Sequence, residues 1–188
     1  MRSQAQRLYD AAWSGDLAAI GAILAEPGAI DSLALSLALS LALEATAFNA
    51  KPEACRLLLE AGADANTREE SNHESVLHQV LAKATESPER AVIVDLLIRN
   101  GAEVNCRTIP GVVTFCFPRD IRTRGETPLH RAAAYGSVEM IQLLLDAGAD
   151  RSAKDAHGES PLTWASWHWR ENDVLKLLLY GEFVGTLG

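Results

Sequence analysis

The histidines and cysteines are the residues of this chain whose types could do chemistry. Either kind could act as a nucleophile with its base or as a metal ligand. His78 and His130 stand in the matching phrases SVLH and TPLH, so they look like copies of one structural position. The remaining histidines have no ligand-like spacing from Asp, Glu or Cys: His73, His157 and His168. We therefore predict no catalytic residue, no metal site and no cofactor.

The three cysteines are widely spaced and form no Cys-x-x-Cys pair: Cys55, Cys106 and Cys116. This argues against both a disulfide framework and a structural zinc site, and favours reduced, buried thiols. No Ser/His/Asp arrangement, phosphate-binding glycine loop or His-Glu-x-x-His motif stands out either. We expect that the protein is not an enzyme.

Composition and charge restrict the class of protein. The 188 residues carry a formal net charge of -8, so non-specific nucleic-acid binding is not expected. The N-terminus lacks the apolar core of a signal peptide, and the most apolar run, Leu33 to Leu43, is shorter than the ~20 residues of a membrane span. We expect a cytoplasmic protein without a membrane partner; the alternatives are the nucleus, or a host cytosol for a secreted effector.

The elements that must position any functional residue come from an internal repeat. GETPLHRAAAYGSVEMIQLLLDAGAD, from Gly125 to Asp150, is followed by GESPLTWASWHWRENDVLKLLLYGE, from Gly158 to Glu182, at a period of 33 residues. The phrase Leu-Leu-Leu-x-x-Gly-Ala-Asp ends at both Asp64 and Asp150, with a close relative ending at Glu103. A fixed period of this length indicates stacked units that bury their apolar faces against each other.

Landmarks of this kind divide the chain into about five units within one domain, 1–188. The predicted units are 5–28, 31–64, 70–103, 122–150 and 155–188. In the fourth unit Thr127 can cap a helix that has Pro128 in its first turn, and Gly136 can end it. Leu129 and Ala132 then lie on one apolar stripe of that helix.

The TPLHRAA stretch and the Gly-Ala-Asp endings resemble the ankyrin repeat family. The resemblance implies an all-α solenoid of stacked helix-turn-helix units, joined by extended segments that we call fingers. It also implies that His78 and His130 brace the fingers by hydrogen bonds. Partners of this family usually meet the concave side, formed by finger tips and by the residue pair after the alanines of each inner helix.

Three segments depart from the pattern. From Ile30 to Ala50 the leucines alternate as in a strand, but the polar residues recur every four positions, which favours one helix over 32–49 in place of a finger. Five extra residues after Ala82 either extend the inner helix or widen the turn. The finger between the third and fourth units carries a strand-like insertion, 107–123, for which we predict a hairpin-like extension.

Aromatic residues are concentrated at the concave pairs, and this selects the candidate binding residues. The predicted contacts on and beside the inner helices are Trp13, Lys83, Tyr135, Trp164, Trp167 and His168. Those on the insertion are Phe115, Phe117, Arg119, Arg122 and Arg124. Tryptophan and tyrosine often anchor interfaces. The alternatives are that the aromatic side chains fill space between inner helices and that the arginines are solvated.

The resulting hypothesis is a non-catalytic module that binds another protein or peptide, as a scaffold, adaptor or inhibitor. The alternative is an enzyme or small-molecule-binding protein with an aromatic pocket, using His168, Glu171 or Asp173 as polar groups. Asn66 and Asn105 resemble the sites that asparaginyl hydroxylases modify in ankyrin repeats, although they could simply stabilise turns. The sequence leaves the oligomeric state unknown.

Overall fold

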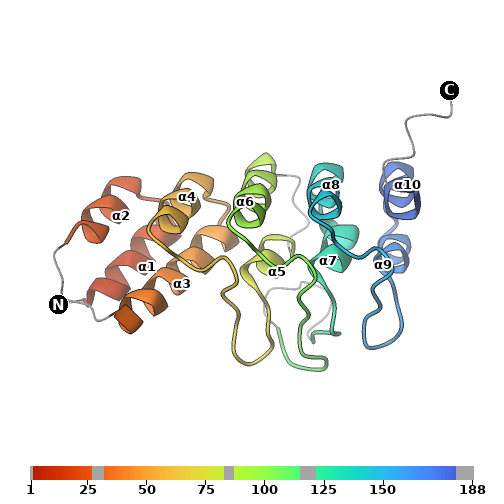
Figure 1. The fold of residues 1–188 in the computed structure, drawn as a ribbon, viewed down its shortest axis with the longest axis horizontal. Coiled ribbons are helices and arrows are strands. Elements are labelled where there is room, and N and C mark those ends of the chain that lie inside the picture. Colours follow the sequence, from red (N-terminus) through yellow and green to blue (C-terminus); the bar gives the residue numbers. More distant parts are fainter. Residues whose placement is uncertain (1, 27–31, 83–86, 115–121, 181–188) are drawn as a thin grey trace.

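The computed structural model describes residues 2–26, 32–82, 87–114 and 122–180, which form ten α-helices and no strand (Figure 1). The helices are α1 (Gln4–Ser14), α2 (Leu17–Leu24), α3 (Ser32–Phe48), α4 (Pro52–Glu60), α5 (Val76–Val80), α6 (Pro88–Arg99), α7 (Pro128–Tyr135), α8 (Val138–Asp146), α9 (Pro161–Trp167) and α10 (Asn172–Tyr180).

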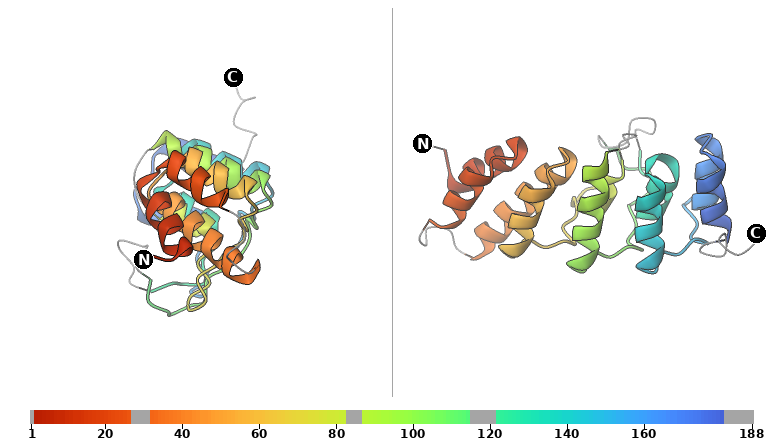
Figure 2. Two further views of the ribbon diagram at one scale, coloured as in Figure 1. Left: turned by 90° about the vertical axis from the view of Figure 1, so that its left-hand side faces the viewer. Right: turned by 90° about the horizontal axis from the view of Figure 1, so that it is seen from above.

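These helices form two parallel layers. The odd-numbered inner helices make one row and the even-numbered outer helices the other, with the fingers projecting beyond the inner row (Figure 1). Each helix packs on the same member of the next pair, for example α1 on α3, α6 on α8 and α7 on α9. Seen from above, the outer helices lie side by side along the molecule, with α2 and α10 at its two ends (Figure 2). The predicted all-α solenoid is confirmed.

Local sequence explains where the helices begin. The side chains of Ser3, Asp16 and Ser137 each accept a hydrogen bond from a backbone N–H in the first turn of the following helix. Proline occupies the first turn of four others, where a missing N–H costs nothing: α4, α6, α7 and α9.

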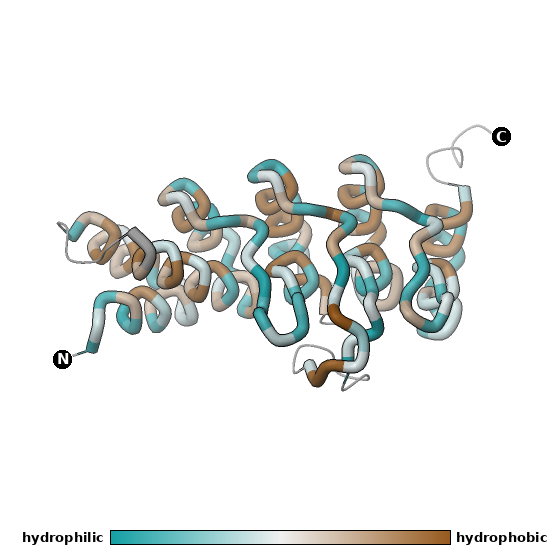
Figure 3. The backbone as a smooth tube through the Cα atoms, turned by 60° about the horizontal axis from the view of Figure 1, so that its bottom comes forward, coloured by the Kyte–Doolittle hydropathy of each residue, from teal (hydrophilic) through white to brown (hydrophobic). Residues whose placement is uncertain are grey.

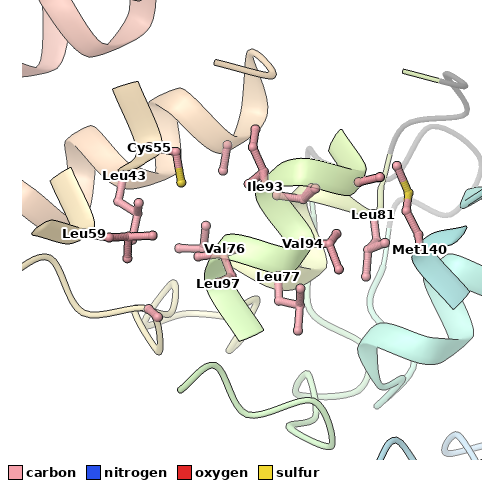
Figure 4. Packing of buried hydrophobic residues seen from close by; sticks show 14 of the residues in the cluster. Leu43, Cys55, Leu59, Val76, Leu77, Leu81, Ile93, Val94, Leu97 and Met140 are labelled. Carbon is pink, nitrogen blue, oxygen red and sulfur yellow. The ribbon is translucent and has the colours of Figure 1, made fainter. Parts of the chain in front are cut away.

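The hydrophobic core is a continuous band between the two layers. Figure 4 shows Leu43, Val76 and Ile93 among the side chains that meet there, contributed by consecutive helix pairs. Met140 of α8 continues the band toward the C-terminal pairs. No helix pair closes its own core, so each depends on its neighbours for burial, as the repeat period predicts.

Arginines near the beginning of two outer helices tie neighbouring pairs together. Arg90 of α6 donates hydrogen bonds to the carbonyl oxygens of Val80 (2.8 Å) and Phe48 (2.9 Å), at the C-terminal ends of α5 and α3. Arg170, before α10, donates to the carbonyl oxygen of Gly136 at the end of α7 (2.5 Å). A positive charge is favourable there, because the last carbonyl groups of a helix carry partial negative charge.

The alternating leucines form the helix α3, as the four-residue spacing of polar positions indicated. From Ala38 onward one face of α3 is buried, whereas Leu37 and Leu41 remain 62% and 44% exposed. The helix occupies the place where the other pairs have a finger (Figure 1).

The other two departures have different outcomes. The inner helix α5 ends at Val80, so of the two alternatives the extended inner helix is wrong. The wider turn stays a prediction, because residues 83–86 lie outside the described residues. In the long finger, the N–H of Gly111 donates to the carbonyl oxygen of Thr123 (2.7 Å), and Val113 and Arg122 form an antiparallel bridge. The tip of the predicted hairpin, 115–121, is not among the described residues. Figure 3 shows hydrophobic stretches on this finger, unlike the polar finger before α5.

In the part of the chain that the structure describes, no helix has the length and apolar character needed to span a membrane.

Candidate binding surface

The two TPLH-type histidines are neutral structural braces. Nδ1 of His130 accepts from the N–H of Thr127 (3.2 Å), so Nε2 carries the proton and donates to the carbonyl oxygen of Glu159 in the next finger (3.1 Å). His78 repeats the arrangement between Ser75 and Glu126. Burial and the nearby Arg131 lower the pKa of His78 to about 3. These rings therefore hold adjacent fingers and are not available as bases at neutral pH.

Cys106 and His78 are close enough to suggest a catalytic pair, but their environment opposes it. The Cys106 Sγ lies 3.8 Å from Nδ1 of His78 and 3.5 Å from the Ser75 hydroxyl. Both side chains are buried, and burial raises the pKa of the Cys106 thiol. A nucleophilic cysteine needs a lowered pKa and access to substrate, and this one has neither.

A buried ionic network fixes the long finger to the stack. The Arg131 guanidinium is fully buried and donates to Oε1 of Glu126 (2.6 Å) and to Glu74. The hydroxyls of Thr108 and Thr114, on the long finger, donate to Glu126 (2.7 Å) and Glu74 (2.6 Å). Burial alone would raise the pKa of Glu126, but Arg131 outweighs it and holds the pKa at about 2. The Glu126 carboxylate thus remains ionised, and the finger base is anchored from two helix pairs.

Aromatic rings of the first two pairs form an N-terminal cluster. The ring of Trp13 is 6.0 Å from that of Phe48, nearly parallel to it, and 6.0 Å from that of Tyr9. Trp13 nevertheless remains 47% exposed. We call these three residues the N-terminal aromatic cluster.

A second cluster lies at the last two pairs. The rings of Tyr135 and His168 meet edge to face at 4.7 Å, and both side chains are partly buried. Trp167, the neighbour of His168, is 48% exposed, and the Arg124 guanidinium lies 5.3 Å from the centre of its ring. This geometry is a cation–π contact. Tyr135, His168, Trp167 and Arg124 form the C-terminal aromatic cluster.

Trp164 corrects the sequence prediction. It is only 2% exposed: its Nε1 donates to Oδ2 of Asp155 (3.2 Å), and its ring packs edge to face on His130 at 5.4 Å. It therefore belongs to the packing between the last two pairs and not to the exposed surface. The physical reason is the repeat register: Trp164 stands 33 residues after the fully buried Arg131, at the position of the inner helix that points into the stack.

The remaining predicted contacts divide between described and undescribed residues. Arg122 is exposed on the long finger and donates to the carbonyl oxygen of Gly111 (2.6 Å). Four predicted residues lie outside the described part of the chain: Lys83, Phe115, Phe117 and Arg119. The structure thus brings the aromatic candidates together in two groups, and one missed residue, Tyr9, joins the first. The signal for Tyr9 was its position one helical turn before Trp13.

Asn66 and Asn105 connect consecutive units through both ends of their amides. Asn105 Nδ2 donates to the carbonyl oxygen of Gly148 (2.9 Å), and its Oδ1 accepts from the N–H of Asp150 (2.8 Å). Asn66 makes the same two bonds to Gly101 and Glu103. This is a structural role between units, more specific than the turn stabilisation considered from sequence, and their hydroxylation stays a prediction.

The groups of the alternative pocket are not assembled. Glu171 and Asp173 are exposed at the beginning of α10, while His168 packs on Tyr135. A surface hollow does occur at α1 and α2, lined by residues such as Arg7 and Asp16, at the end of the molecule opposite to His168. Among the described residues, no group of three or more His, Cys, Asp or Glu is arranged to hold a metal ion.

Comparison with known proteins identifies the repeat. A family model described as ankyrin repeats, in three copies, matches residues 93–186. The chain is 36% identical to mouse Rabankyrin-5 over 89 residues. This aligned stretch is 47% of the chain and 7% of that protein. The chain is also 44% identical to the rice E3 ubiquitin-protein ligase XB3 over 50 residues. That stretch is 27% of the chain and 11% of the ligase.

A third relative is the bovine inactive serine/threonine-protein kinase TEX14, 38% identical over 73 residues, which is 39% of the chain and 4% of that protein. The chain thus spans only a small part of each of these relatives. The family match covers half of the chain and agrees with the layered helix pairs and the braced fingers. This protein belongs to the ankyrin-repeat family.

Proposed function

We propose that this chain is a non-catalytic protein-interaction module that holds a peptide or protein segment against its inner-helix and finger surface. Ankyrin repeats generally act as protein-interaction modules, and curved solenoids offer extended concave surfaces for binding. The proposal rests on one observation: Trp13 and Trp167, at corresponding ends of inner helices, are left 47% and 48% exposed.

Exposed tryptophan at these positions supports binding for an energetic reason. An indole ring that stays half in water has not gained the stabilisation that full burial would give, so a partner can still supply it. In both clusters a neighbouring group packs against the indole ring: Phe48 against Trp13, and the Arg124 guanidinium against Trp167. Preorganised rings lose little conformational entropy on binding, as is typical of interface anchors.

The test is a selection from a displayed random-peptide library on the folded protein. We expect the wild-type chain to enrich peptides whose binding falls at least about tenfold in Trp13→Ala or Trp167→Ala, the loss typical of an interface anchor. Val92→Ala on α6 and Leu179→Ala on α10 are matched controls, because both side chains are exposed on outer helices. Urea unfolding of every variant separates lost binding from lost folding.

Enrichment of peptides that bind all variants equally would contradict the proposal. Enrichment of no peptide at all would contradict it as well. The asparaginyl hydroxylation considered above is a separate proposal; mass spectrometry of the protein from its native cell would show an added oxygen on Asn66 or Asn105, or its absence.

A further inference from the structure

Charged side chains are unevenly distributed among the fingers. The two fingers before α7 and α9 expose four basic side chains, which we call the basic finger surface: Arg107, Arg122, Arg151 and Lys154. The same fingers also expose Glu103 and Asp150. The finger before α5 instead exposes the carboxylates of Glu69 and Glu70. A protein with a formal net charge of -8 therefore concentrates positive charge at one end of its finger edge.

Hydrogen bonds join the two fingers that carry these basic groups. Arg107 Nη1 donates to the carbonyl oxygens of Gly125 (2.9 Å) and Lys154 (2.6 Å), bridging the two fingers. The N–H of Ala156 donates to the carbonyl oxygen of Arg124 (2.8 Å), a second link between them. The fingers are thus held side by side, and their arginines and lysine share one patch.

The positive charge of this patch is only partly compensated. Arg107 and Arg122 donate to backbone carbonyl oxygens, which carry no net charge, and the exposed Asp150 carboxylate is close enough to offset part of the charge of Arg107. Arg124, by contrast, pairs with the buried Asp155 carboxylate at 3.1 Å. Its role is to hold the face of Trp167, which joins the charged patch to the C-terminal aromatic cluster.

We propose that the basic finger surface and Trp167 together bind an acidic peptide segment that carries an apolar side chain beside its carboxylates. The carboxylates would meet Arg107, Arg122, Arg151 and Lys154, and the apolar side chain would cover the exposed indole. This inference rests on the proposed function and specifies the chemistry of its partner.

The limits of the patch favour a peptide over a nucleic acid. A polyanion that continued along the fingers would reach Glu69 and Glu70, both exposed on the finger before α5. Nucleic-acid surfaces need basic groups over a long track of phosphates. A short acidic segment fits within two fingers, and its apolar side chain covers the exposed indole of Trp167, which a phosphate backbone cannot do.

The experiment uses the peptides selected from the random library by the full chain. We expect the peptides that depend on Trp167 to be rich in Asp and Glu, with an apolar residue among them. Their binding, measured by fluorescence anisotropy, should be about tenfold weaker for Arg151→Glu/Lys154→Glu than for wild type, and wild-type binding should weaken as salt is raised. Arg56→Glu/Lys176→Glu carries the same change in charge on the outer helices α4 and α10 and should bind like wild type. Glu69→Lys/Glu70→Lys, which extends the basic patch, should bind more tightly.

Three results would overturn the inference. The first is that the selected peptides are neutral or basic. The second is that acidic peptides bind the Arg151→Glu/Lys154→Glu variant as tightly as wild type while still requiring Trp167; this result leaves the proposed function standing. The third is displacement of the peptide by a single-stranded oligonucleotide at equal concentration, which would assign the patch to nucleic acid. Absence of any Trp-dependent peptide would instead remove the proposed function itself.

Discussion

At the scale of single residues, the chain places its polar groups according to whether they can be paired. His78, His130 and Arg131 are buried, and each finds its hydrogen-bond partners in a neighbouring unit. Glu44 on α3 differs, because it is largely buried and faces the carboxylates of Glu69 and Glu74. Burial and these like charges raise the pKa of the Glu44 carboxyl to about 7, against an ordinary value of 4.5.

This shift predicts that the free energy of unfolding falls as the pH rises and Glu44 ionises. The folded protein holds the Glu44 proton more tightly than the unfolded chain does. The stabilisation that comes from this bound proton is therefore fully present below about pH 4.5 and is lost as the pH rises through about 7. Glu44→Gln, which stays neutral, should raise the free energy of unfolding at pH 8 by on the order of 1 kcal/mol and change little at pH 4.5. Urea unfolding at the two pH values measures it.

Glu53→Gln, on the exposed face of α4, is the control and should show no such pH dependence. A gain for Glu44→Gln that is the same at both pH values would contradict the explanation, because it would not follow the ionisation of the carboxyl.

At the scale of elements, the long finger depends on charges that the helices supply. Its Thr108 and Thr114 hydroxyls bond to Glu126 and Glu74, and Arg131 of α7 neutralises both carboxylates. Removing one partner of a buried ion pair leaves uncompensated charge in a poorly hydrated site, which costs far more than the pair itself contributes.

We predict that Arg131→Met lowers the free energy of unfolding by about 3–5 kcal/mol and speeds amide hydrogen exchange at Thr108 and in the paired flanks of the finger. Arg99→Met is the matched control: Arg99 pairs with Asp95 on the surface of α6, with 75% of its side chain exposed, and should change stability by less than about 1 kcal/mol. Equal effects of the two substitutions would show that the buried network does not hold the finger.

At the scale of the whole molecule, stability comes from the contact of each helix pair with the next. Leu144 and Met140 of α8 and Ala133 of α7 are almost fully buried, and α9 and α10 pack against those two helices. In a solenoid the total stability is close to a sum of units and of the interfaces between neighbours.

Removing residues 151–188 should therefore expose an apolar flank while the remaining pairs stay folded. We expect Tm to fall by more than about 5 °C with most helical circular dichroism per residue retained. A chain ending at Tyr180 separates the loss of the pair from the loss of the tail. Complete loss of helicity on removing the last pair would mean that the stack folds as one indivisible core.

The sequence by itself determined the repeat, the helix pairs and the helix of alternating leucines. These depend on local periods, caps and glycines, which act within a few residues of the chain. It also indicated Trp13, Tyr135 and Trp167, because the repeat register states which positions lie at the ends of inner helices.

The tertiary structure alone decided which aromatic side chains stay exposed and which charges meet. Trp164 and Trp167 lie three residues apart on one helix, yet one is buried and the other half exposed, because burial depends on the neighbouring finger and not on the helix itself. Likewise Arg131 meets Glu74, which is 57 residues away in sequence, only because stacking places the two units in contact. Local patterns specify the units; packing between units specifies the surface that remains.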